Sequence, residues 1–149
     1  MISNISKRYA RAFFEIAGEE KKLEQYYNEL HQFSSMMAEN KDLGGFLANP
    51  IFEQGVKKNV LEKIIGKVTL SPMTVNFLKL LVDKNRIDVL PDIDTCYRLM
   101  MDEALQKTRV TVKTAFPLSA DMQQYIMSNL KKLTGREAEV TVEDDKSLL

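Results

Sequence analysis

The stretch from residue 71 to residue 86 is predicted to form a helix whose apolar side chains cover a wider arc than packing on one side requires. Ser71 and Pro72 indicate a helix start, because serine caps free backbone N–H groups and proline suits the first helical position. Asn85, which tolerates left-handed geometry, predicts the end. At ~100° per residue the apolar side chains span roughly 220°, whereas one packed side needs about 100°. Either the helix is enclosed by its own domain, or one side is kept for another chain.

A second helix, predicted from about Ser3 or Asn4 to Ala17, has the same excess. Asn4 or Ser6 is expected to cap it and Gly18 to end it. Its apolar side chains span roughly 200° at ~100° per residue. One side consists of Ile5, Tyr9, Ala12 and Ile16, the other of Ala10, Phe14 and Ala17, with Phe13 between them.

The remaining pattern predicts a mostly α chain with a change of architecture near its end. Further helices are expected at about 21–39, 41–47, 52–67 and 91–107, which completes an N-terminal six-helix bundle over residues 1–107. Residues 108–149 form a small, incomplete α/β region, strand–helix–strand, with strands at 109–116 and 138–143. Its helix, at about 120–133, is predicted to turn inward Met122, Tyr125, Ile126, Leu130 and Leu133. This region is too small to bury a core alone and leaves sheet edges unpaired, so we expect the chain to be truncated at its C-terminus.

Composition excludes several functional classes. Among 149 residues, the 21 basic and 21 acidic side chains cancel and are interleaved, so no basic surface for nucleic acid is expected. Cys96 is the single cysteine and is expected to be a small, buried or half-buried filler. No signal peptide is visible, and no apolar run reaches the ~18 residues of a membrane span.

No catalytic, cofactor or metal motif is present. The single histidine, His31, lies on the flank of its helix, and the chain has no second histidine and no cysteine pair, so a structural role is expected. Gly44 and Gly45 fall inside a short helical stretch and form no phosphate-binding loop. We therefore expect no catalytic residues, no cofactor and no metal, and not an enzyme.

Periodicity alone leaves two interpretations of the two wide helices. They are the enclosed central pair of the bundle, or they lie side by side and form a groove for a partner's amphipathic helix. Ala10 and Ala12 permit close approach of a backbone, and Tyr9 offers a large anchor with a polar tip.

Several short motifs, in order along the chain, resemble the δ subunit of F-type ATP synthase, whose mitochondrial relative is the oligomycin sensitivity-conferring protein. The motifs are Tyr9-Ala10-x-Ala12-Phe13, Asn76-Phe77-Leu78-x-Leu80-Leu81, Leu90-Pro91-x-Ile93-x-x-x-Tyr97, Thr114-Ala115-x-Pro117-Leu118-Ser119 and Asp145-x-Ser147-Leu148. The resemblance implies a non-catalytic stator subunit of the peripheral stalk, which links the catalytic head to the b-subunit stalk and resists rotation.

The same resemblance implies the partners and their sites. In this family the bundle binds the N-terminal helix of an ATP synthase α subunit between the first and fifth helices, and the C-terminal α/β domain meets the b subunits. Transferred to this chain, the α-binding residues are Ile5, Tyr9, Ala12, Ile16, Met73, Asn76, Phe77 and Leu80. Phe13, Ala10, Phe14, Ala17, Leu78, Leu81, Val75 and Val82 are then assigned to the bundle.

Two other functional classes remain as alternatives. One is a helical scaffold that binds a partner amphipathic helix outside the synthase, and the other is a small enzyme built on the strand–helix–strand region. The lack of a transit segment leads us to expect a bacterial protein, bound peripherally at the cytoplasmic face of the cell membrane.

Overall fold

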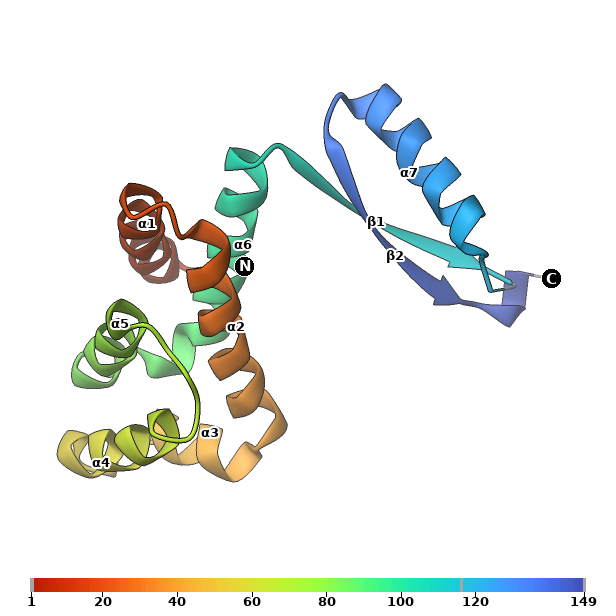
Figure 1. Ribbon diagram of the computed structural model, residues 1–149. Coiled ribbons are helices and arrows are strands. Elements are labelled where there is room, and N and C mark those ends of the chain that lie inside the picture. The colour runs from red at the N-terminus through yellow and green to blue at the C-terminus, as the bar shows by residue number, and fades with distance from the viewer. Residues whose placement is uncertain (1, 116, 149) are drawn as a thin grey trace. The chain divides into compact units, whose positions relative to one another are not determined.

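The computed structural model describes residues 2–115 and 117–148. Backbone contacts divide the chain into two compact units, Met1–Met101 and Asp102–Leu149, where the sequence led us to expect a boundary between residues 107 and 108. The helices are α1 (Asn4–Glu19), α2 (Leu23–Glu39), α3 (Lys41–Ala48), α4 (Gln54–Ile65), α5 (Pro72–Asp83), α6 (Leu90–Ala104) and α7 (Ala120–Thr134), with a 3-10 turn, η1 (Ile87–Val89), before α6. The mostly α fold class is confirmed (Figure 1).

Helix α1 starts at Asn4, as expected, but its capping residue and its C-terminal end differ from the prediction. The Ser3 hydroxyl accepts a hydrogen bond from the N–H of Ser6 at 3.2 Å, so the cap is Ser3. After Glu19, it is Lys21 that takes the left-handed conformation, at φ 58°, and not Gly18. The chain therefore continues helically past its first glycine, because glycine permits a left-handed turn but does not require one.

Helix α5 has the predicted bounds, but its N-terminus is stabilised by other hydrogen bonds than the predicted serine cap. The Ser71 side chain caps none of the helix's own N–H groups. Its N–H and its hydroxyl instead donate to Oε1 of Glu29 on α2, both at 2.8 Å, and the Thr74 hydroxyl donates to Oε2 at 2.6 Å. At the other end, Asn85 lies at φ 55° and the N–H of Arg86 donates to the carbonyl of Leu81 at 2.7 Å, which confirms Asn85 as the stop.

The bundle core is centred on the aromatic ring of Phe13. This ring lies 4.4 Å from that of Phe77, 5.5 Å from that of Tyr26 and 5.7 Å from that of Tyr97, measured between centroids. Tyr97 is fully buried, and its hydroxyl donates to the carbonyl of Leu23 at 2.7 Å. One aromatic cluster therefore joins α1, α2, α5 and α6.

The second unit is a parallel β–α–β unit. Strand β1 (Lys107–Thr114) pairs with β2 (Glu137–Asp144), and α7, which contacts β2, lies between them in sequence; a 3-10 turn, η2 (Lys146–Leu148), follows. The predicted inward face of α7 is wrong at three positions. Met122, Tyr125 and Leu133 are 55%, 70% and 83% exposed, whereas Ile126 and Leu130 are half-buried. Two strands are too narrow to cover the whole apolar stripe of a helix.

Candidate functional site: an apolar groove between α1 and α5

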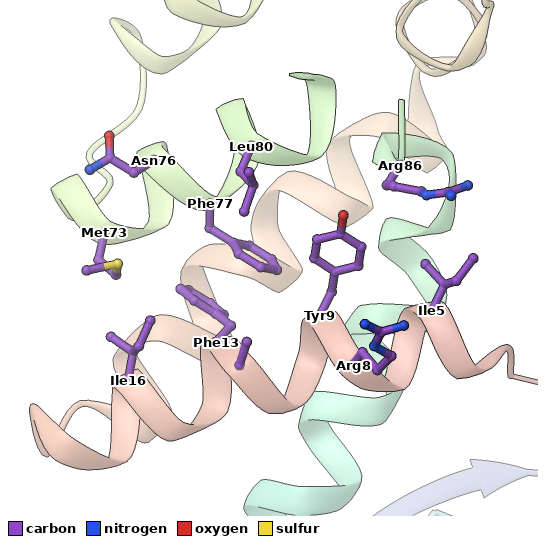
Figure 2. Close-up of a pocket in the computed structure, with 11 residues that line it drawn as sticks. Ile5, Arg8, Tyr9, Phe13, Ile16, Met73, Asn76, Phe77, Leu80 and Arg86 are labelled. Atoms are coloured by element: carbon purple, nitrogen blue, oxygen red, sulfur yellow. The ribbon is translucent and has the colours of Figure 1, made fainter. Parts of the chain in front are cut away.

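A groove of about 550 Å³ runs between α1 and α5 (Figure 2). Its lining is mainly apolar. It consists of Ile5, Arg8, Tyr9, Ala12, Phe13 and Ile16 from α1, Met73, Asn76, Phe77 and Leu80 from α5, and Arg86 from the turn that follows α5. The two wide helices are therefore not enclosed on all sides.

All eight residues expected to bind a partner line this one groove. They are Ile5, Tyr9, Ala12 and Ile16 on α1, with Met73, Asn76, Phe77 and Leu80 on α5. Ala12, Asn76 and Leu80 are exposed, Phe77 is buried, and the other four are half-buried. That these residues bind a partner stays a prediction, but the structure brings them together.

Phe13 and Phe77 form the floor of the groove and also belong to the bundle core. Phe13 is 1% exposed and Phe77 is 7% exposed, and their rings stack at an interplanar angle of 9°. Tyr9 and Phe77 form a T-shaped pair, with the ring centroids 6.4 Å apart and an interplanar angle of 66°. An occupant would thus rest on side chains that also hold the domain together.

Neighbouring residues of α5 face opposite environments. Leu80 is 41% exposed in the groove, whereas Leu81 is completely buried in the bundle. Leu78 and Val82 are buried too, as are Ala10 and Ala17 on α1. Helical rotation of ~100° per residue separates the two faces, and an apolar residue on both sides explains the wide arc in the sequence.

Sequence reasoning missed three lining residues. Phe13 was assigned to the core, which is correct, but it also forms the floor. Arg8 lies three residues after Ile5 and four before Ala12, so its helical phase could have placed it on the groove. Arg86 follows the left-handed Asn85, and no periodicity extends through that turn.

His31 and Cys96, which lie outside the groove, have structural surroundings. Nδ1 of His31 lies 2.8 Å from Oδ2 of Asp94, and the His31 ring stacks on Tyr27. Cys96 is buried, as expected, and burial raises the pKa of its thiol. In the described part of the chain, no cluster of three or more His, Cys, Asp or Glu residues could hold a metal ion. Over the same part, no helix is both long and apolar enough to cross a membrane.

Comparison with known proteins gives consistent matches along nearly the whole chain. The model of the family described as ATP synthase delta (OSCP) subunit matches residues 5–149. ATP synthase subunit delta of Syntrophus aciditrophicus (strain SB) is 54% identical over 147 residues, which cover 99% of this chain and 81% of that protein. ATP synthase subunit delta of Geobacter sp. (strain M21) is 37% identical over 145 residues, covering 97% of this chain and 81% of that protein.

The fold has a counterpart among solved structures. A chain in the cryo-EM structure of the Toxoplasma gondii mitochondrial ATP synthase hexamer superimposes with a TM-score of 0.72 at 24% identity. The match covers 97% of this chain and 81% of that chain. At this identity the likeness concerns the fold.

Proposed function

The chain belongs to the ATP synthase delta (OSCP) subunit family, and we propose that its α1–α5 groove holds the N-terminal helix of an ATP synthase α subunit. As a member of this family it is an accessory subunit of the F-type synthase, without a catalytic site of its own. Such a subunit belongs to the peripheral stalk, the stator that connects the catalytic head to the b-subunit stalk and resists rotation.

The observation that carries the proposal is an open apolar groove with the dimensions of a short helix. From Ile5 to Ile16 the α1 wall rises by about 16 Å at ~1.5 Å per residue, which equals three helical turns. An amphipathic helix with apolar residues at i, i+3 or i+4, and i+7 would place three or four anchors along that length. Exposed Leu80 and Ala12 supply one large and one small contact for them.

An apolar contact suits a connection that carries mechanical load. Affinity differences within one type of interface reside mostly in the dissociation rate, and desolvated apolar anchors slow dissociation without depending on salt. Phe77 and Tyr9 give the occupant rigid aromatic surfaces that lose little side-chain freedom on binding. We therefore expect the contact to persist while the rotor turns.

Isothermal titration calorimetry of the whole chain with a peptide from the α-subunit N-terminus measures the dissociation constant and so tests the proposal. We expect Leu80→Asp to weaken binding at least about tenfold, because it places a charge among the apolar anchors. Thermal unfolding should be nearly unchanged, since Leu80 is 41% exposed. Leu99→Asp is the matched control: this leucine is 58% exposed on α6, outside the groove, and should bind the peptide as the wild type does.

Other outcomes of this titration would overturn the assignment. A Leu80→Asp chain that unfolds, while Leu99→Asp does not, would make Leu80 a core residue. A wild-type chain that ignores the α-subunit peptide would favour the alternative function, a helical scaffold that binds an amphipathic helix outside the synthase.

We further propose that the second unit contacts the b subunits of the stalk. The support is the exposed apolar side of α7, formed by Met122, Tyr125 and Leu133. Tyr125→Asp should then reduce capture of b subunits while leaving α-subunit binding intact, as measured by pull-down with each partner. Equal capture by wild type and variant would place the b contact elsewhere.

The proposed location is the cytoplasmic face of the bacterial cell membrane, as a peripheral subunit of the synthase. The bacterial sources of the related delta subunits support it. Membrane vesicles that hold the synthase should retain the chain, and the double variant Leu80→Asp with Tyr125→Asp, which lacks both proposed contacts, should be released into the supernatant. Equal retention of both forms would mean that neither surface is needed for attachment.

A further inference from the structure

Two arginines give the groove a charged end. Arg8 from α1 and Arg86 from the turn after α5 are the only charged residues of its lining in the part of the chain that is described. Figure 2 shows both near Ile5, whereas Met73 and Ile16 mark the opposite, apolar end. Because α1 and α5 run in opposite directions along the groove, the start of one and the end of the other meet there.

Neither guanidinium has a partner within the described residues. Both side chains are exposed, and no hydrogen bond or ion pair joins either of them to residues 2–115 or 117–148. Other charges of α5 differ in this respect: Lys79 pairs with Glu62 at 3.2 Å, and Asp83 pairs with Lys58. The charges on the outer side of α5 are thus neutralised within the chain, and those at the groove are not.

Capping of α5 does not account for the Arg86 side chain. The carbonyls of Leu80, Leu81 and Val82 already accept hydrogen bonds from the backbone N–H groups of Lys84, Arg86 and Asn85. These are the carbonyls that a cationic side chain would otherwise satisfy at a helix C-terminus. The guanidinium of Arg86 is left available for an occupant of the groove.

The apolar part of the groove does not by itself fix the direction of an occupant. A helix with one apolar stripe can place its anchors against Tyr9, Phe77 and Leu80 with its chain running either way along the groove, because apolar contacts are not directional. A charged end removes this ambiguity. A guanidinium offers a carboxylate two parallel N–H donors, so an acidic turn of the occupant is favoured at one end only.

We propose that Arg8 and Arg86 bind acidic side chains in one terminal turn of the helix that occupies the groove, and thereby set its direction. The proposal rests on the proposed function and specifies the partner's chemistry. An occupant whose acidic turn is N-terminal runs parallel to α1, and one whose acidic turn is C-terminal runs antiparallel to it.

Designed peptides of about 18 residues, or five helical turns, test the proposal with the whole chain. Three peptides share one apolar stripe and differ only in one terminal turn, which carries two Glu, two Gln or two Lys residues. We expect the Glu peptide to bind about three- to tenfold more tightly than the Gln peptide, the range for a pair of exposed ion pairs. High salt should remove the difference.

Charge reversal provides the decisive comparison. In the double variant Arg8→Glu with Arg86→Glu, the order should invert, so that the Lys peptide binds more tightly than the Glu peptide. Arg11→Glu is the matched control, because Arg11 is an exposed arginine of α1 that does not line the groove. That variant should keep the wild-type order, with the Glu peptide first.

A nitroxide label on the acidic end of the Glu peptide reports direction. It should broaden the backbone amide signals of Ile5 and Arg8 more than those of Ile16 and Met73, and a label on the other end should do the reverse. Equal broadening from both ends would overturn the proposal.

The outcomes separate this proposal from the function on which it rests. If the three peptides bind equally and Leu80→Asp weakens all of them, the groove takes a helix but the arginines do not orient it. If none binds, the groove does not take an amphipathic helix, and both proposals are wrong.

Discussion

The carboxylate of Glu29 takes the place of a helix cap for Ser71. Oε1 of Glu29 accepts hydrogen bonds from both the N–H and the hydroxyl of Ser71, each at 2.8 Å, although Glu29 and Ser71 lie 42 positions apart in the sequence. A negative charge at a helix N-terminus is also favoured by the helix dipole. The contact therefore ties α2 to the start of α5, the helix that carries Leu80.

Removing the Glu29 carboxylate should lower the stability of the bundle. We expect Glu29→Ala to reduce the free energy of unfolding by about 1.5–3 kcal/mol, because three donors lose a charged acceptor and the N–H of Ser71 is left unpaired. Glu29→Gln keeps the size of the side chain and should lose less. Urea unfolding measures both, with Glu39→Gln, an exposed residue of the same helix, as the control. Equal stability of Glu29→Ala and wild type would show that water replaces the carboxylate.

Two adjacent residues of α1 should respond in opposite ways to substitution. Ala12 is exposed in the groove, so Ala12→Trp should fill it and weaken α-peptide binding at least about tenfold, at little cost in stability. Phe13 is 1% exposed, so Phe13→Ala should lower the free energy of unfolding by about 3–5 kcal/mol. Calorimetric titration and urea unfolding of both variants give the comparison. A stable Phe13→Ala chain would contradict the aromatic core, and undiminished binding by Ala12→Trp would place the peptide elsewhere.

Stability should fall at alkaline pH through Tyr26. The hydrogen bond that its hydroxyl donates to Glu20, followed by burial, raises the pKa of Tyr26 from its ordinary value of 10.0 to about 12. The folded state thus holds this proton more tightly than the unfolded state. The stabilisation is complete below pH ~10 and is lost as the pH rises from there towards ~12. Urea unfolding between pH 8 and pH 11.5, roughly the window in which tyrosine titrates, should show the fall. Tyr26→Phe should show a shallower one, and parallel curves would refute the assignment.

The core-facing and groove-facing sides of α1 and α5 could be predicted, because in each helix the geometry fixes the position of one side relative to the other. Once Leu81 and Phe13 occupy the core, rotation of ~100° per residue places Leu80 and Ala12 beside it. A second apolar stripe then has to face something other than the core. The resemblance to the delta family, and not periodicity, distinguished a groove from an enclosed helix pair.

The features that could not be predicted depend on contacts between distant segments. Glu29 looks like an ordinary charge on an amphipathic helix, and only the packing of α2 against α5 makes it a cap. Arg86 lies after a left-handed turn, where helical phase is lost. Tyr125 has the spacing of a core residue, but the two-stranded sheet does not reach it.

The stacked rings of Phe13 and Phe77 belong to the groove and to the core at once. A partner that binds the folded groove and not the unfolded chain adds its binding free energy to that of folding. A copy that waits for assembly therefore opens more often than one already built into a stalk. Since proteases cleave opened chains, an orphan subunit should be degraded faster than one that has its partner in the groove.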